Sequence, residues 1–270
     1  MFVFLIFYKN LKSSIFILSL VKSEIEEIVV KAFQEAQNSV LKRNTGSRLR
    51  TMHVSDFVSP CLRKTYYQKT FPDFTMDDDK RSALWFGTIV HEFSKLSHFH
   101  EVTMCYDIER DIALSPQEVS LMPTSETQNI ITGTCDDLMK IGEDFILVDK
   151  KTWNGRGYKK TTPDESYVMQ LNIYRVLLKE NYGIDAKYGA LLYLDKSNNL
   201  TPLPLAFKLA PIGKTKKIMR DIMLQLKSGI PEATPCFLCN GKNRDKKIYC
   251  PYLDKCNEDT RKLADQTDNV

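Results

Sequence analysis

Two acidic residues and a lysine stand in neighbouring apolar segments and are of the types that act together in catalysis. Asp136 lies before Gly142-Glu143, whereas Asp149 and Lys151 lie after it. Gly142-Glu143 suits a two-residue hairpin turn, with glycine in the first central position. Such a turn pairs Asp136 with Asp149, and the alternation of side chains along a strand places Lys151 on the same face as Asp149. The sequence therefore predicts two carboxylates and an ammonium group at one place.

This combination of groups indicates hydrolysis that depends on a metal ion. Opposed carboxylates repel each other in a purely structural sheet, but they suit a divalent cation, because hard cations bind oxygen ligands. An ammonium beside them can orient or activate an attacking water and stabilise charge that develops on a phosphate. The alternative is an exposed hairpin whose polar face happens to hold these residues.

A histidine and a glutamine–tyrosine pair have helical spacings that would bring them to the same place. Gly87 and His91 are four residues apart, as are Gln170 and Tyr174, and residues four apart share a helix face. Gly87 would let its helix approach another backbone closely, and His91 would add a nitrogen ligand to the metal. Gln170 and Tyr174 would reach a phosphate or Lys151. Each of these residues also has an ordinary structural interpretation.

The elements that would position these residues follow from capping residues and from the spacing of apolar residues. We expect strands between about residues 102 and 152, where the segments are short, β-branched and separated by turn residues. Around them we expect a buried strand at 188–194 and helices at 23–40, from Ser59-Pro60 through 67, at 84–96, from Thr162 to Gly183 and at about 212–226. The last dozen residues are expected to be frayed. This order indicates an α/β core with helices packed on it.

Composition and cysteine usage narrow the class of protein. The chain has 270 residues, a net charge of +4 and 43% hydrophobic residues, which is typical of a globular protein. Its mildly basic charge is compatible with a nucleic-acid partner without requiring one. Four of its seven cysteines crowd the C-terminus, namely Cys236, Cys239, Cys250 and Cys256. Because the chain is not a short secreted scaffold, this crowding favours metal or cluster ligation over disulfides.

The first 22 residues form an apolar extension that polar residues interrupt. Neither of its two apolar runs approaches the ~18 residues of a membrane-spanning helix, and no positive region precedes the first run, as a signal peptide would require. We therefore expect an intracellular, cytoplasmic protein without stable membrane association. The alternative is a membrane anchor in residues 1–21.

The motifs described above also resemble those of a known family. Gly87-x-x-x-His91, Gly133-x-x-Asp136, Asp149-x-Lys151 and Gln170-x-x-x-Tyr174 occur in the order seen in the RecB-like branch of the PD-(D/E)xK nucleases. The resemblance covers about residues 55–256 and implies a restriction-endonuclease-like core, in which helices flank a central mixed sheet. It implies that Lys151 is catalytic together with Asp136 and Asp149, and that Gln170 and Tyr174 support the site or bind substrate. It also implies a Mg²⁺ or Mn²⁺ ion held by His91, Asp136, Asp149 and the Lys150 backbone carbonyl.

The cysteines are similar to those of the CRISPR-associated and helicase-linked exonucleases within that branch. These enzymes hold a 4Fe–4S cluster with one cysteine before the nuclease core and three after it. The resemblance implies that Cys61, Cys250 and Cys256 are ligands, with either Cys236 or Cys239 as the fourth, because Lys247 stands where the family usually has a cysteine. The alternative is a Zn²⁺ ribbon made by the four C-terminal cysteines without Cys61. Cys105 and Cys135, in strand-like segments, are expected to be buried packing residues.

The resemblance implies an exonuclease that hydrolyses DNA ends or single strands, in CRISPR adaptation or in DNA repair and recombination. Its partners would be DNA, CRISPR adaptation proteins or helicases. The alternative is a non-catalytic nucleic-acid-binding protein with a zinc ribbon. The segment 153–160 is basic, aromatic and glycine-rich, so it would either contact DNA or form a solvated loop.

The predicted organisation of the chain has five parts. They are an apolar extension (1–22), a helical segment with the first cluster cysteine (23–75), the nuclease core (76–230), a cysteine-rich segment (231–258) and a tail (259–270).

Overall fold

The structure is a computed structural model that describes residues 50–71, 85–91, 95–97, 99–156, 160–234, 239 and 250–267. The predicted N-terminal extension and the predicted helix at 23–40 lie outside these residues. The chain divides into two compact units, of which the second, 47–76 with 86–270, contains every labelled strand and helix described below. Within the described ranges, no helix is long and apolar enough to cross a membrane.

A mixed sheet forms the centre of this unit, as the sequence predicts. Its strands lie in the order β3-β2-β4-β5-β6-β7, and β1 also pairs with β4. The β5–β6 and β1–β4 pairs are parallel, and the other pairs are antiparallel. The strands are β1 (Met52–His53), β2 (Phe99–Asp107), β3 (Ile112–Leu114), β4 (Ile130–Ile141), β5 (Asp144–Trp153), β6 (Tyr188–Asp195) and β7 (Thr201–Lys208).

The hairpin between β4 and β5 has the register that its turn predicts. Asp137 pairs with Val148 and Leu138 with Leu147, around a turn in which Gly142 has a φ of +62°. That left-handed backbone favours glycine, which carries no Cβ. The register brings Asp136 and Asp149 to the same level of the two strands, at the end of the ladder remote from the turn.

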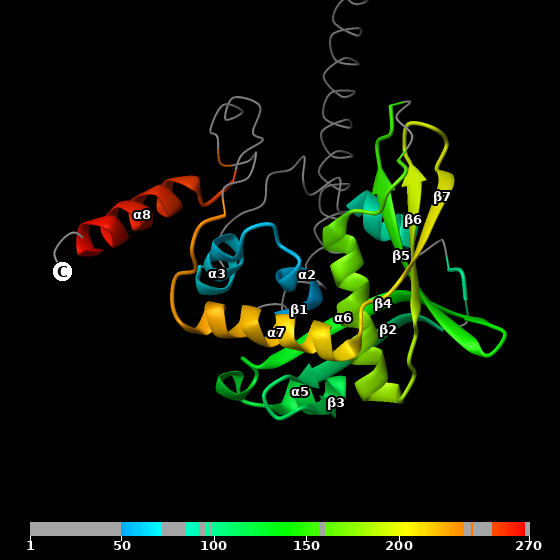
Figure 1. Cartoon of the computed structure of the whole chain (residues 1–270), viewed down its shortest axis with the longest axis horizontal. Helices are drawn as coiled ribbons and strands as arrows, with labels where there is room; N and C mark the ends of the chain where they lie inside the picture. The colour runs from blue at the N-terminus through cyan, green and yellow to red at the C-terminus, as the bar shows by residue number, and fades with distance from the viewer. Residues whose placement is uncertain are drawn as a thin grey trace, which may run out of the picture. The chain divides into compact units, whose positions relative to one another are not determined.

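Helices pack on this sheet (Figure 1), and among the described helices α6 has the longest run of buried residues, from Gln170 to Leu178. It contacts α7 and strands β2, β4, β5 and β6, so its side chains fill the main hydrophobic core. The helices with assigned bounds are α2 (Val54–Phe57), α3 (Leu62–Thr70), α5 (Pro116–Leu121), α6 (Glu165–Tyr182), α7 (Ile212–Lys227) and α8 (Leu253–Thr267), and a 3-10 turn spans Thr124–Glu126. Residues 85–91 are also helical.

The C-terminal end of α6 confirms the prediction, whereas the N-cap residue lies two residues after Thr162, where the helix was expected to begin, and its side chain makes no capping bond. Asp164 is the N-cap residue, and Gly183 ends the helix in a left-handed conformation, with a φ of +71°. The Gly183 N–H donates to the Lys179 carbonyl over 2.9 Å, so glycine both allows and closes the final turn.

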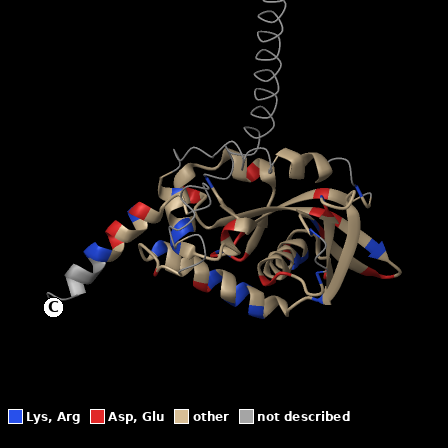
Figure 2. Cartoon of the chain, turned by 90° about the horizontal axis from the view of Figure 1, so that it is seen from above, with Lys and Arg blue, Asp and Glu red and all other residues tan. Residues whose placement is uncertain are grey.

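Basic residues recur along α7 (Figure 2), and some of them form ion pairs. Lys216 lies 2.7 Å from Asp111 and 2.9 Å from Glu180, which joins α7 to the β2–β3 turn and to α6. Helix α7 buries Thr215, Met219 and Met223 at intervals of one helical turn.

Three sequence expectations are wrong in detail. Helix α3 begins at Leu62 with Cys61 as its N-cap residue, so Pro60 precedes the helix rather than opening it. The region predicted to contain only strands also holds α5, whose Ser115 and Glu118 form a capping box. The last dozen residues are not frayed throughout, because α8 continues to Thr267.

Strand β7, which contains Pro202 and Pro204, is not among the predicted strands. It lies at the sheet edge beside β6, where a missing N–H can face away from the ladder.

Candidate metal-dependent active site

Asp136 and His91 meet as the sequence predicts. The Nδ1 atom of His91 lies 3.1 Å from Asp136 Oδ2, and the backbone N–H of Lys150 donates to the same oxygen over 2.7 Å. The Asp136 carboxylate is thus fixed from β5 while its histidine partner approaches from the helix at 85–91. Burial alone would raise the pKa of Asp136, but the hydrogen bond and charge of His91 outweigh it and hold that pKa below its usual value.

Asp149 and Lys151 form a close ion pair on one face of β5, which confirms their predicted alternation. The Lys151 Nζ atom lies 2.8 Å from Asp149 Oδ2 and 3.0 Å from Oδ1, and 4.7 Å from the centre of the Tyr167 ring on α6. Asp149 is almost fully buried. Burial raises the pKa of Asp149 to about 6 against the opposing charge of Lys151, and the charge of Asp136 adds to the rise.

A further acidic residue, Glu101, lies with His91 and Asp136 in a set of groups that could hold a metal ion, and sequence reasoning missed this glutamate. One ligand atom from each of His91, Glu101 and Asp136 lies within 4.8 Å of the others. The β2–β4 register, in which His100 pairs with Asp137 and Val102 with Cys135, brings Glu101 level with Asp136. Glu101 has a φ of +51°, a strained backbone for a residue with a side chain. No motif marked this glutamate, and only the strand pairing could have found it.

The donor atoms of this set suit a divalent cation. Carboxylate oxygens are the ligands that Mg²⁺ and Mn²⁺ prefer, and an imidazole nitrogen suits transition metals. Burial lowers the pKa of His91, yet the hydrogen bond and charge of Asp136 more than compensate and raise it. Burial and the charge of Asp136 together raise the pKa of Glu101. A carboxylate whose charge raises the pKa of its acidic neighbour, and a histidine held by that same carboxylate, are better matched once a cation lies between them.

A second, fully buried ion pair supports the segment that carries His91. Lys150 Nζ lies 2.9 Å from Asp137 Oδ2, and the two side chains are 1% and 0% exposed. Asp137 Oδ1 accepts the backbone N–H groups of Leu96 and Ser97 over 2.9 and 3.2 Å, and Lys150 Nζ donates to the His91 carbonyl over 3.4 Å. The pair therefore ties β4 and β5 to both ends of the 91–97 segment. Sequence reasoning gave neither side chain this role.

Gln170 and Tyr174 lie beneath the site and bond to each other. Gln170 Nε2 donates to the Tyr174 hydroxyl over 3.1 Å. Burial, and next the charge of Asp149, raise the pKa of Tyr174. The predicted contact of this pair with a phosphate or with Lys151 stays a prediction, as does metal binding by the Lys150 carbonyl.

The two motif glycines differ in what surrounds them. A Cβ at Gly133 would lie 2.5 Å from Val54 Cγ2 and 2.7 Å from Tyr174 Cε1, so glycine is needed for α2 and α6 to approach β4. A Cβ at Gly87 would meet no atom within 4 Å in the part of the chain that the structure describes. The close backbone approach that we expected there is not seen.

Some of the cysteines that were predicted to bind a cluster lie near one another. Cys239, Cys250 and Cys256 pack in one cluster with Tyr67 and Tyr252. Arg63, two residues after Cys61, donates to the Cys256 sulfur over 3.6 Å and to the Pro231 carbonyl over 2.7 Å. Among the described cysteines, no three lie at ligating distance, and Cys236 lies outside the described residues. Cys105 and Cys135 are buried, as predicted.

No family model matches the sequence, and no curated protein gives a significant match. Among solved structures, the crystal structure of SSO0001 aligns with a TM-score of 0.53 and 18% identity, covering 82% of this chain and 95% of that one. A provisionally assigned exonuclease from Eubacterium rectale aligns with a TM-score of 0.38 and 13% identity, over 75% of this chain and 90% of that one. The alkaline exonuclease LHK-Exo from Laribacter hongkongensis gives 0.39 and 11%, over 68% and 91%. The chain thus shares its fold with SSO0001, and at these levels the other two alignments carry no argument.

Proposed function

We propose that the protein is a metal-dependent nuclease that hydrolyses phosphodiester bonds of DNA. The observation that carries this proposal is the convergence of His91, Glu101 and Asp136 within 4.8 Å, beside the buried Asp149–Lys151 ion pair. An exposed hairpin with an incidental polar face would not bring three such groups together beside a lysine. The order of the four motifs, which resembles the PD-(D/E)xK nucleases, supports the same conclusion.

The residues divide the chemistry among them. His91, Glu101 and Asp136 would hold a Mg²⁺ or Mn²⁺ ion, with Asp149 and the Lys150 carbonyl completing its ligands. The ion, when bound, would lower the pKa of a water and neutralise phosphate charge. The water oxygen forms a bond to phosphorus, and the bond to the leaving oxygen breaks. Lys151 orients that water and donates to a phosphate oxygen as negative charge develops.

The substrate and setting follow from the resemblance and not from the geometry. We propose an exonuclease that acts on DNA ends or single strands, in CRISPR adaptation or in DNA repair and recombination. CRISPR adaptation proteins or helicases would then be its partners.

We also propose that the C-terminal cysteines hold a 4Fe–4S cluster together with Cys61. The contact of Arg63 with Cys256 supports this, since it brings the segment after Cys61 to α8. Anaerobically purified protein should show a broad absorption shoulder near ~400 nm, and Cys61→Ser should abolish it while Cys105→Ser leaves it. Stoichiometric zinc with a colourless protein would instead establish the zinc ribbon.

Metal binding should be visible as thermal stabilisation that grows with pH. At about 100 times its Kd a ligand stabilises the folded state by about 2.7 kcal/mol, which for a chain of this size raises the melting midpoint by about 5–10 °C. Because the pKa of Asp149 is about 6 rather than 3.8, the folded protein keeps a proton there that the unfolded chain releases. The stabilisation of the fold that this proton provides is fully present below about pH 4 and is lost as the pH rises through about 6. A proton and a cation compete for this carboxylate, so Mg²⁺ or Mn²⁺ should stabilise more at pH 8 than at pH 5.

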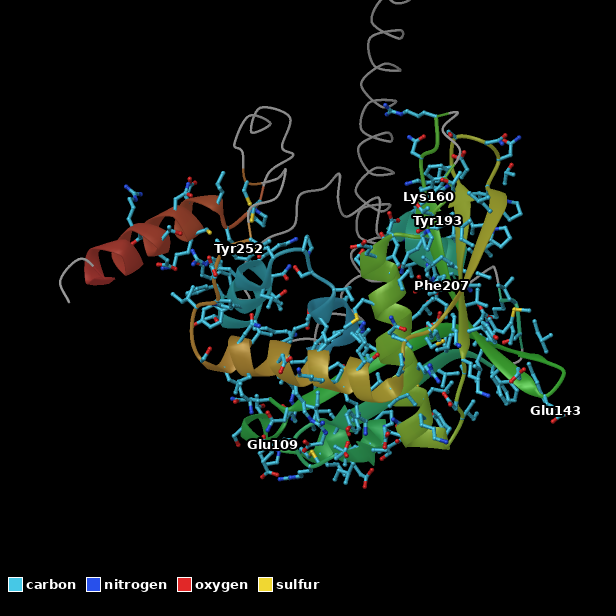
Figure 3. All side chains as sticks on the ribbon, in the orientation of Figure 1. Glu109, Glu143, Lys160, Tyr193, Phe207 and Tyr252 are labelled. Carbon is cyan, nitrogen blue, oxygen red and sulfur yellow. The ribbon has the colours of Figure 1, made fainter. Side chains whose placement is uncertain are left out.

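Two matched glutamate variants test whether Glu101 binds the ion. Glu101→Gln should reduce the shift that Mn²⁺ causes, whereas Glu143→Gln should leave it unchanged, since Glu143 is exposed at the tip of the β4–β5 hairpin (Figure 3). Equal shifts in the two variants would exclude Glu101 as a ligand. The absence of any shift in the wild type with either metal would exclude the site.

A further inference from the structure

Aromatic rings and lysines alternate around the end of the sheet where the candidate site lies. In the parallel β5–β6 register, Lys151 is the partner of Tyr193, and Trp153 follows on the same face of β5. The Trp153 and Tyr193 rings meet edge to face at 6.3 Å. Lys160 lies 4.9 Å from the centre of the Tyr193 ring and 6.0 Å from that of Trp153 (Figure 3). Trp153 is half-buried, so part of its surface stays open to solvent.

Two neighbouring elements extend this pattern on either side. Tyr167, half-buried on α6, lies over Lys151, one turn before Gln170. Phe86, on the helix that carries His91, lies 5.9 Å from the Lys196 ammonium, and it is 36% exposed. Lys196 is held to the same end of the sheet because its backbone N–H donates to the Trp153 carbonyl over 2.9 Å.

Hydrogen bonds within the protein hold Tyr193, Lys160 and the turn after β5 in place. Asp164, the N-cap residue of α6, accepts from the Tyr193 hydroxyl over 2.8 Å and from Lys160 over 2.9 Å. Asp195 accepts the Gly155 N–H over 3.0 Å, and a Cβ at Gly155 would lie 2.4 Å from its other oxygen. The turn after β5 is therefore packed closely against β6, and Tyr193 and Lys160 are both held by Asp164.

We propose that Phe86, Trp153 and Tyr167 form a stacking surface for the bases of a single nucleic-acid strand, whose phosphates Lys160 and Lys196 bind. This inference rests on the proposed function and names the form of its substrate. Rings interleaved with cations match the alternation of bases and phosphates along one strand. A duplex keeps its base faces stacked within itself and would offer these rings nothing. The surface is continuous with Lys151 through Tyr167, so a strand lying on it leads its phosphate to the ion pair.

The surface can be tested by binding, in a Lys151→Ala background that keeps the strand intact. Trp153→Leu and Phe86→Leu should each raise the Kd for a labelled single-stranded oligonucleotide about tenfold, and Trp153→Phe should recover most of the affinity. Tyr182→Leu is the matched control, because Tyr182 is 53% exposed at the opposite end of α6. The Kd for a blunt duplex should not respond to any of these changes.

A fluorescence measurement reports the contact directly and does not depend on stability. The chain has two tryptophans, so Trp85→Phe leaves Trp153 as the only tryptophan, and the single strand should quench its emission under excitation selective for tryptophan. Unchanged single-strand affinity in Trp153→Leu and Phe86→Leu, without quenching, would overturn the surface. Equal losses for duplex and single strand would overturn the assignment to a single strand. Quenching by a single strand that the wild type never cleaves in Mg²⁺ or Mn²⁺ would retain the surface and reject the proposed function.

Discussion

Lys151→Ala is expected to lower the rate of metal-dependent DNA cleavage by about 10²–10³-fold, the usual cost of removing one preorganised donor from developing negative charge. Lys151 is suited to this role because Asp149 holds its ammonium at 2.8 Å. Burial lowers the pKa of Lys151, but the charge and hydrogen bond of Asp149 outweigh it and raise that pKa, so the group stays protonated at neutral pH. The rate is measured on a labelled oligonucleotide in Mg²⁺ and in Mn²⁺.

Lys140→Ala is the matched control for this variant. Lys140 lies on the same hairpin, is exposed, and stands near the turn, away from the site. Its loss should leave the cleavage rate within about twofold of the wild type, because a surface charge remote from the chemistry contributes little. Lys151→Ala should retain DNA binding. Cleavage at the wild-type rate in Lys151→Ala would remove this lysine from the mechanism.

Asp137→Ala is expected to destabilise the protein by about 3–5 kcal/mol, because it leaves the Lys150 ammonium buried without its counter-charge. Lys150 is 1% exposed, so water cannot replace the lost carboxylate. The backbone N–H groups of Leu96 and Ser97 lose their acceptor as well. The loss is measured as the free energy of unfolding in a denaturant titration.

Two variants test whether the loss of stability comes from the buried ion pair or from any substitution in the hairpin. Asp144→Ala, at the exposed start of β5, should change the unfolding free energy by less than about 0.5 kcal/mol. The double variant Asp137→Leu/Lys150→Met should be more stable than Asp137→Ala, since replacing both members of a buried pair by apolar groups avoids the unpaired charge. A loss in Asp137→Ala no larger than that in Asp144→Ala would show that the buried pair does not stabilise the fold.

The local parts of the site could be predicted because their signals are short in range. A two-residue turn fixes the register of its own hairpin, so Asp136, Asp149 and Lys151 were placed from sequence alone. Gly183 likewise marked the C-terminal end of α6, and the segment from Thr162 to Glu165 placed its start to within three residues. His91 was found through its spacing from Gly87, although the close approach expected of that glycine is not seen.

The remaining parts depend on contacts between segments that are distant in sequence. Glu101 joins the site only through the pairing of β2 with β4. Lys150 and Asp137 are sequence neighbours of residues whose roles could be predicted. Their own side chains alternate to the other face of the strands, and the sequence does not show that the segment after His91 lies there. The prolines of β7 conceal an edge strand, because the sequence does not show which side of a strand lacks a neighbour.

The most direct measurement of the central proposal is cleavage of an end-labelled single-stranded DNA by the wild-type protein, with EDTA and Lys151→Ala in parallel. We predict cleavage in Mg²⁺ or Mn²⁺ that EDTA abolishes and that Lys151→Ala reduces at least about 10²-fold. Cleavage that persists in EDTA, or the absence of cleavage in both metals, would contradict a metal-dependent nuclease built on Asp136, Asp149 and Lys151.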